Sequence, residues 1–131
     1  MSQWDAEILA QQLAQLGRDL QDEVKILGAL EELVANTEGM YRSLQEVHED
    51  NLARALLAAE GSVDTKKAIA RLGCVPSRQE AELAGLEWNR TKGKLNTQRA
   101  SLQALHRRCE IGRSLLSREK ALISLAGVGE V

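Results

Sequence analysis

Apolar residues recur along the first half of the chain at alternating steps of three and four. The positions are 6, 9, 13, 16, 20, 23, 27, 30, 34, 37, 41, 44, 48, 51, 55 and 58, and twelve of these sixteen carry an apolar residue or Tyr. This spacing predicts a long α-helix with one apolar stripe, which we call the first seam, and it is typical of coiled coils. We expect its polar members, Glu23, Thr37, His48 and Asn51, to fix register or partner number.

The helical pattern ends where glycine and proline follow each other closely. It continues past Gly61 to Leu72 and stops at the sequence Gly-Cys-Val-Pro, residues 73–76. We expect Gly73 to adopt the left-handed conformation beyond a helix end, with proline just after it. Ser77, with Glu80 three residues later, predicts a capping box that opens a second helix.

These signals predict a single helical module over residues 1–131. The expected parts are an acidic first helix over 1–72, a turn at 73–77, a basic second helix over 78–126 and a tail at 127–131. Glycines allow the first helix to break near 36–39 or 61–64, in which case a three- or four-helix bundle could close on itself. In either case we expect an all-α fold, and our main prediction is a long antiparallel helical hairpin or coiled coil completed by oligomerisation.

Two rows of side chains recur every seven residues in the second helix. The apolar row is Trp88, Leu95, Leu102, Cys109, Leu116 and Ile123, with Leu105 and Ala126 expected on the same face. The basic row is Lys92, Arg99, His106, Arg113 and Lys120, four residues after members of the apolar row. In a heptad the basic row therefore flanks the helix contact.

Charge separates the two halves of the chain. Residues 1–65 hold 4 Lys/Arg and 13 Asp/Glu, whereas residues 66–131 hold 13 Lys/Arg and 6 Asp/Glu. One interpretation is that the basic row pairs with acids of the first helix, and the available acids are Glu31, Glu38, Glu46, Glu49, Asp50 and Glu60. The other is that the row binds nucleic-acid phosphates. Further cations would widen such a surface: Arg90, Lys94, Arg107, Arg108 and Arg118.

The composition narrows the class of protein. Aromatic residues make up 2% of the chain and there is one proline, which argues against all-β and α/β folds. No apolar run reaches the length of a membrane span, and the N-terminus lacks the pattern of a signal peptide. We therefore expect a cytoplasmic protein with no membrane contact. Cys74 and Cys109 are then expected to be reduced and to pack as small apolar side chains.

Unequal helix lengths predict an interface near the N-terminus. A second helix shorter than the first would leave about 20 N-terminal residues uncovered, by the length arithmetic of a hairpin. The exposed part of the seam would consist of Leu9, Leu13, Leu16 and Leu20. Since a two-helix layer also buries little apolar surface, we expect a homo-oligomer or a partner protein at these leucines.

Motifs for catalysis, metals and cofactors are missing from the sequence. The segment Glu46–Asp50 has metal-ligand residue types, but Gln45 stands where a carboxylate three residues before His48 would be needed. There is no HExxH, CxxC pair or phosphate-binding glycine loop. We expect no enzymatic activity, no metal, no cofactor and no small-molecule substrate.

A stretch of the second helix resembles a known group of proteins. Residues 109–120 read Cys-Glu-Ile-Gly-Arg-Ser-Leu-Leu-Ser-Arg-Glu-Lys, and residues 61–67 read Gly-Ser-Val-Asp-Thr-Lys-Lys. Over residues 55–127 the chain is similar to a poorly characterised family of small helical proteins encoded by tailed bacteriophages. The resemblance implies a place near phage recombination and replication functions, in a host cytoplasm, and no particular reaction.

Two functions follow as hypotheses. The first is a non-enzymatic coiled-coil accessory protein of phage DNA recombination or replication. Its partner would be DNA or a phage recombination protein, and the predicted nucleic-acid-binding residues are Lys92, Arg99, Arg107, Arg108, Arg113 and Lys120. The second is a structural or inhibitory protein–protein interaction module, such as a virion component or an inhibitor of a host factor. That module would use the acidic first helix and its leucines.

Overall fold

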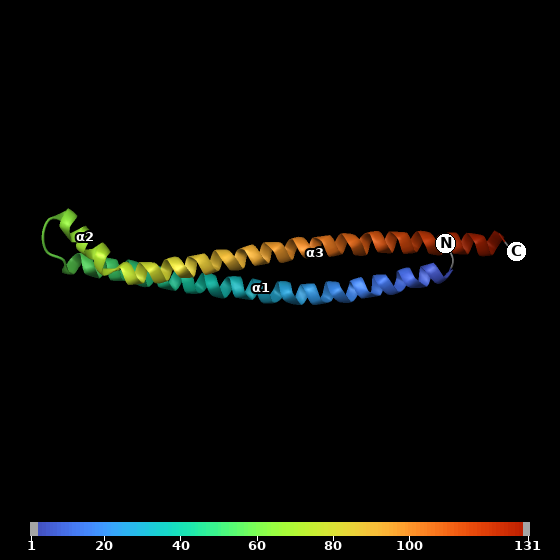
Figure 1. Ribbon diagram of the computed structural model, residues 1–131, viewed down its shortest axis with the longest axis horizontal. Coiled ribbons are helices and arrows are strands. Elements are labelled where there is room, and N and C mark those ends of the chain that lie inside the picture. The colour runs from blue at the N-terminus through green and yellow to red at the C-terminus, as the bar shows by residue number, and fades with distance from the viewer. Residues whose placement is uncertain (1–2, 130–131) are drawn as a thin grey trace. The chain divides into compact units, whose positions relative to one another are not determined.

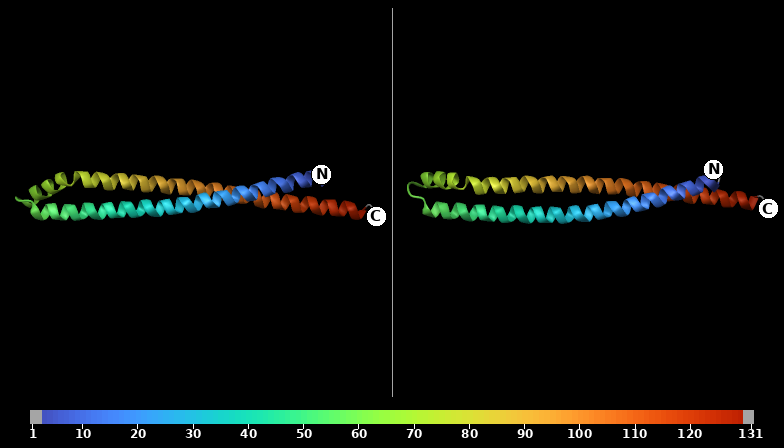
Figure 2. Two further views of the ribbon diagram at one scale, coloured as in Figure 1. Left: turned by 90° about the horizontal axis from the view of Figure 1, so that it is seen from below. Right: turned by 60° about the horizontal axis from the view of Figure 1, so that its bottom comes forward.

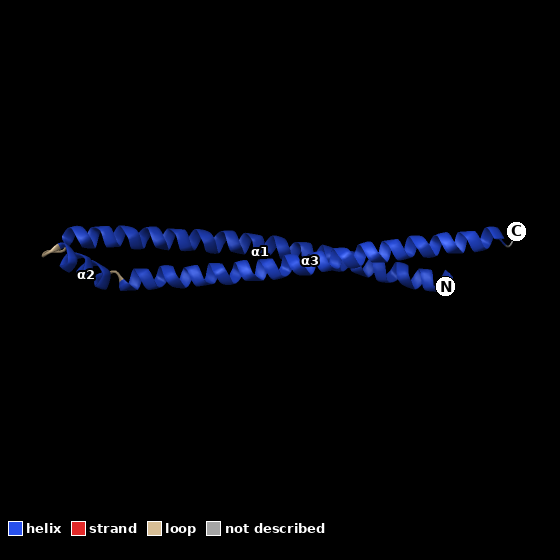
Figure 3. Ribbon diagram, turned by 90° about the horizontal axis from the view of Figure 1, so that it is seen from above, coloured by secondary structure: helices blue, strands red, loops and turns tan. Residues whose placement is uncertain are grey.

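The chain folds into three α-helices. The computed structural model describes residues 3–129. Helix α1 spans Gln3–Ala58, α2 spans Val63–Gly73 and α3 spans Val75–Gly129 (Figure 1). Within residues 3–129 every regular element is a helix, as the colouring in Figure 3 makes plain. The all-helical class predicted from the sequence is confirmed.

The helices contribute to two compact units. Unit 1 consists of Met1–Gly28 and Asn96–Val131, and unit 2 consists of Ala29–Leu95. Unit 1 therefore contains the N-terminal part of α1 with the C-terminal part of α3. Unit 2 contains the rest of both helices together with all of α2.

In unit 2, α1 and α3 run antiparallel. The hydroxyl of Thr37 lies 2.9 Å from that of Thr91, and Nδ1 of His48 lies 2.9 Å from the hydroxyl of Ser77. Residue numbers thus rise on α1 as they fall on α3. The green part of α1 and the yellow part of α3 can be followed side by side in Figure 2.

Unit 1 has the same antiparallel pairing. The amide of Gln98 donates to the side chain and to the main-chain carbonyl of Glu23. Nearer the N-terminus of α1, a Cβ atom on Gly112 would lie 3.0 Å from Cδ1 of Leu13. The absence of a side chain at Gly112 therefore lets Leu13 pack directly on the backbone of α3.

The first seam faces α3 along most of α1. Every seam position from Ala6 to His48 is buried or half-buried. Beyond His48 the prediction is wrong at two positions, because Asn51 and Ala58 are exposed and Leu52 is half-buried instead. Helix α2 explains the change: a cleft lined by Glu49, Leu52, Ala53, Leu56, Lys67 and Arg71 shows that it lies against another side of α1.

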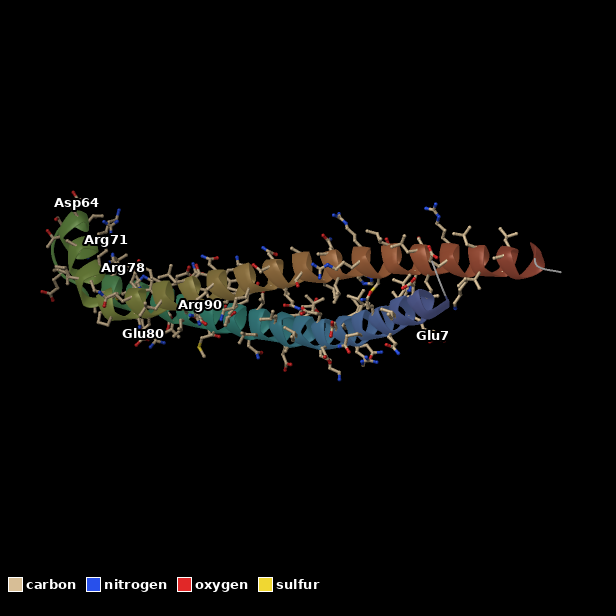
Figure 4. All side chains as sticks on the ribbon, turned by 45° about the vertical axis from the view of Figure 1, so that its right-hand side comes forward. Glu7, Asp64, Arg71, Arg78, Glu80 and Arg90 are labelled. Carbon is tan, nitrogen blue, oxygen red and sulfur yellow. The ribbon has the colours of Figure 1, made fainter. Side chains whose placement is uncertain are left out.

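The chain turns at Gly61. Its φ of +115° is in the left-handed region, which glycine adopts without strain. Ser62 then caps α2, its hydroxyl accepting a hydrogen bond from the amide of Thr65 at 3.3 Å. Asp64 in the first turn and Arg71 in the last complement the helix dipole (Figure 4). Of the two predicted breaks in the first helix, the one near 61–64 is present, and α1 is continuous through 36–39.

The turn predicted at 73–77 is shorter than expected. Helix α3 begins at Val75, and the amide of Arg78 donates to the carbonyl of Cys74 at 3.0 Å. Pro76 is tolerated because the first turn of a helix needs no amide donor there. Ser77 consequently lies inside the helix rather than at a capping box, and Gly73 is not in the left-handed conformation.

These boundaries make the two long helices nearly equal, with 56 residues in α1 and 55 in α3. The expectation of an uncovered leucine seam is therefore wrong. In unit 1 all four leucines are half-buried: Leu9, Leu13, Leu16 and Leu20. The helix α3 also includes residues 127–129 of the predicted tail, while residues 130 and 131 lie outside the described residues.

Candidate nucleic-acid interface

The apolar row of α3 faces α1 as predicted. All six of its members are buried or half-buried, and Cys109 is 1% exposed. Ala126 is the exception on that face, because it is exposed. Ile123 lines a cleft with Ala6, which lies close to the first residue of α1, Gln3. At Ala126, three residues further along α3, little of α1 is left to cover the side chain.

Because the apolar row faces α1, the basic row lies beside the contact between the two helices. Arg99, His106, Arg113 and Lys120 belong to unit 1 and are exposed, whereas Lys92 belongs to unit 2 and is half-buried. Seven residues of helix rise about 10 Å, so the four exposed members form a regularly spaced line on one side of α3.

The residues across from this line in unit 1 are mostly uncharged. Lys120 lines a cleft of 410 Å³ with Ala6, Ala10 and one acid, Glu7. In an antiparallel pair, seven residues forward on α1 correspond to seven residues back on α3. Starting from Ala10 and Lys120, this register places Gly17 beside Arg113 and Val24 beside His106. Small and apolar residues are therefore expected beside Arg113 and His106, whereas an acid lines the cleft at Lys120.

Some of the acids expected to neutralise the basic row have partners on their own helix. Glu38 pairs with Arg42 at 2.9 Å, and Asp50 pairs with Arg54 at 3.0 Å. On α3, Arg78 lies 3.7 Å from Glu82, and Arg90 lies 3.2 Å from Glu87. All of these pairs are well exposed to solvent, so each contributes little net stability.

Lys92 has a different environment from the rest of the row. Its Nζ atom lies 3.8 Å from the centroid of the Trp88 ring, and Arg42 approaches the same ring at 5.9 Å. Tyr41 of α1 stacks on Trp88 with ring centroids 5.5 Å apart. Cation–π attraction thus ties Lys92 to the helix contact in unit 2, which makes it the least available of the six predicted nucleic-acid-binding residues.

Among the other predicted residues, Arg108 differs from its neighbours. It lines a cleft of 360 Å³ in unit 1 with Asp19, Asp22 and Glu23, whose negative charge favours the guanidinium and competes with a phosphate. Arg107, Arg113 and Lys120 make no ion pair with any other residue in the described range 3–129. These three side chains are exposed cations of the candidate surface without an ion pair in that range.

Sequence reasoning missed the polar residues that α3 contributes to the helix contact. Thr91 is fully buried, Glu119 is buried, and Ser77 and Gln98 are half-buried. Three of them meet the polar members of the first seam, in the pairs Thr37–Thr91, His48–Ser77 and Glu23–Gln98. Thr91, Gln98 and Glu119 each stand three residues after a member of the apolar row, and that spacing would have identified these three but not Ser77.

The chemistry of the His48–Ser77 pair is defined by its neighbours. The Ser77 hydroxyl donates to the carbonyl of Cys74 at 3.0 Å, so it accepts a hydrogen bond from the N–H at Nδ1 of His48. This contact satisfies polar groups between two helices, and no carboxylate of residues 3–129 takes part in it. We assign it a structural role.

The described residues contain neither a cluster of metal ligands nor a membrane-spanning helix. Across residues 3–129, no three His, Cys, Asp or Glu side chains come together as they would around a metal ion. None of the helices described is both long and apolar enough to cross a membrane. Cys74 and Cys109 are buried free thiols.

No family model, curated protein or solved structure matches this chain. The similarity to phage proteins noted for residues 61–67 and 109–120 therefore stays a prediction.

Proposed function

We propose that this protein is a non-enzymatic helical accessory protein that binds nucleic-acid phosphates through the basic row of α3 in unit 1. The observation that carries the proposal is that Arg107, Arg113 and Lys120 are exposed and make no ion pair with any residue of the described range 3–129. The heptad register expects the uncharged Gly17 beside Arg113, and Glu7 is the one acid that lines the cleft at Lys120. Cations left without a protein partner attract a polyanion and release its counterions on binding.

The surface suits backbone contact rather than base recognition. Its exposed cations are about 10 Å apart along a helix, and Arg107 widens the line. No aromatic side chain lies between His106 and Lys120 that could stack on a base. We therefore expect binding that depends weakly on sequence and strongly on salt.

The setting of this activity rests on the resemblance alone. A phage recombination or replication complex, in a host cytoplasm, contains single- and double-stranded DNA on which such a protein would act. The alternating seam supports coiled-coil packing of α1 on α3 within each unit as part of the same proposal.

Fluorescence anisotropy of labelled single- and double-stranded DNA over a salt series tests the proposal. The informative variant carries Arg107→Glu, Arg113→Glu and Lys120→Glu. Because each lost phosphate contact lowers the log–log salt slope by about 0.9, we expect the slope to fall by about three units. The matched control reverses the same number of charges elsewhere, with Lys25→Glu, Lys66→Glu and Lys67→Glu, and should keep most of the affinity.

Flat anisotropy at low salt would contradict the proposal. So would an equal loss of affinity in the control variant, because the effect would then come from net charge alone. Circular dichroism of both variants should show unchanged helix content, since all six substituted residues lie on helices as exposed or half-buried side chains.

A protein–protein interaction module is the second candidate function. The surface first predicted for it, the leucines from Leu9 to Leu20, is half-buried against α3. Apolar side chains elsewhere on α1 are exposed, and they favour an interaction through that helix. A virion component or an inhibitor of a host factor would fit this candidate.

A further inference from the structure

An uncharged stripe runs along the outside of α1 in unit 2. Its members alternate at steps of four and three, and they are Ala29, Leu33, Asn36, Met40, Ser43 and Val47. All six are exposed, and the apolar side chains Leu33, Met40 and Val47 are 41%, 60% and 51% exposed. We call these residues the outer stripe. Because they alternate as core positions do, they have the pattern of a second helix-packing surface without a helix on it.

Charged residues of both signs flank the outer stripe. Glu32 and Glu46 precede Leu33 and Val47 on α1, Arg42 precedes Ser43, and a cleft beside Val47 is lined by Arg54 as well as by Glu80 of α3. Without a surplus of positive charge, the stripe does not favour nucleic acid or anionic lipid. A protein surface of apolar character is the occupant that fits.

Similar side chains follow in the same order on both sides of Asn36 in the outer stripe. From the centre at Asn36, the next members are the long side chains Leu33 and Met40, and after them the small side chains Ala29 and Ser43. One further step of the alternating spacing, before Ala29 and after Ser43, leads to the β-branched residues Ile26 and Val47. A surface of this kind is complementary to itself when two helices pack antiparallel about a two-fold axis.

The exposed area of the chain leaves room for such a contact. The chain exposes 9609 Å². A compact protein of 14.4 kDa is expected to expose about 6,800 Å², so roughly 2,800 Å² is surplus. A standard interface buries about 800 Å² on each partner, well within that surplus.

We propose that the outer stripe is the interface between two copies of this chain, with α1 packed antiparallel on α1 of the second copy and the two-fold axis at Asn36. Leu33 then meets Met40 of the other copy, and Ala29 meets Ser43. The two Asn36 amides hydrogen-bond across the axis and fix the register, as a polar residue does in an apolar helix contact. This proposal does not depend on DNA binding, because no residue of the outer stripe belongs to the basic row.

Mass measurement by sedimentation or light scattering tests the interface. We expect the wild-type chain to be a dimer at about 100 µM, a concentration at which an interface of standard size is occupied. The variant Leu33→Glu with Met40→Glu should be a monomer of unchanged helix content, because both side chains are exposed in the single chain. The matched control is Leu72→Glu with Leu86→Glu, which are 75% and 65% exposed outside the stripe and should leave the dimer intact.

Thiol crosslinking tests the position of the axis. Asn36→Cys should be joined to its copy by a short bis-maleimide, since both thiols lie at the axis. Ala35→Cys is the control, because it is exposed one residue away and points about 100° around the helix. The native Cys74 and Cys109 are 5% and 1% exposed and give little background.

Three outcomes would overturn the proposal. One is a wild-type monomer over the whole concentration range with no crosslink at Asn36→Cys. Another is a dimer that survives Leu33→Glu with Met40→Glu. The third is a monomer that binds vesicles of zwitterionic phospholipid through the stripe, which would assign the surface to lipid.

Discussion

The hydroxyl of Thr37 on α1 lies 2.9 Å from the hydroxyl of Thr91 on α3, at a position where Thr91 has no exposed surface. Each hydroxyl is also within reach of main-chain carbonyls of its own helix, those of Leu33 and Val34 for Thr37 and that of Trp88 for Thr91. Two hydroxyl protons are thus shared among several acceptors. The pair is a polar contact between two helices with every group satisfied.

Replacing the two threonines separately and together should give non-additive effects. We expect Thr91→Val to lower the free energy of unfolding by about 0.5–1.5 kcal/mol, because it leaves Thr37 facing a methyl group. The double variant, Thr37→Val with Thr91→Val, should be close to wild type, because neither partner is then left behind. Urea unfolding followed by circular dichroism measures all three, and additive losses would show that the hydroxyls act independently.

Trp88 has a buried indole N–H that finds no hydrogen-bond partner among residues 3–129. Phenylalanine would keep the stacking on Tyr41 and the contact with Lys92, and it would remove the unsatisfied donor, which costs about 1–3 kcal/mol when buried. We therefore expect Trp88→Phe to change the free energy of unfolding by less than about 1 kcal/mol, although the ring becomes smaller. Trp88→Ala should cost about 3–5 kcal/mol. Equal losses in the two variants, measured by urea unfolding, would contradict this account.

Two glycines of unit 2 should respond oppositely to alanine. Apart from the neighbouring backbone of its own helix, no atom of residues 3–129 lies within 4 Å of a Cβ at Gly39, so Gly39→Ala should stabilise α1 by about 1 kcal/mol through helix propensity. At Gly85 a Cβ would lie 3.0 Å from Cε2 of Tyr41, whose ring is held against Trp88. Gly85→Ala should therefore lose most or all of that gain. Thermal unfolding of the pair tests the difference, and equal stabilisation would mean that Tyr41 moves freely.

Removing the N-cap of α2 should destabilise that helix locally. Ser62→Ala removes the acceptor for the Thr65 amide and should cost about 1 kcal/mol, while Ser62→Asp should retain the cap. Hydrogen exchange is the sensitive measurement, because the amides of α2 should exchange faster in Ser62→Ala and those of α3 should not. Uniform loss of protection across the chain would show that α2 unfolds only with the rest.

The sequence predicts the long helices well because one periodicity governs each of them. Apolar positions at steps of three and four identify the buried side of α1 from Ala6 to His48 without knowledge of its partner. The region around residues 73–77 is different, because its signals conflict. Pro76 ends one helix or begins another with equal ease, and the structure resolves this in favour of a start at Val75.

The candidate site was predictable only in part, for a related reason. Spacing alone places Arg113 and Lys120 on one line of α3. What lies across from that line depends on the register between two helices, which the sequence of either helix leaves open. Ala10 beside Lys120 and acids beside Arg108 are therefore known only from the structure.

The polar pairs of unit 2 limit how the length of the chain can change in evolution. Deleting seven residues of α1 between Thr37 and His48 would preserve the helix face but place one of the two polar residues opposite an apolar side chain. The same deletion made at once in α3, between Ser77 and Thr91, would restore both pairs. Insertions and deletions in this part of the gene are thus expected to occur as matched heptads on both helices, so that a lineage lengthens or shortens by two coordinated events.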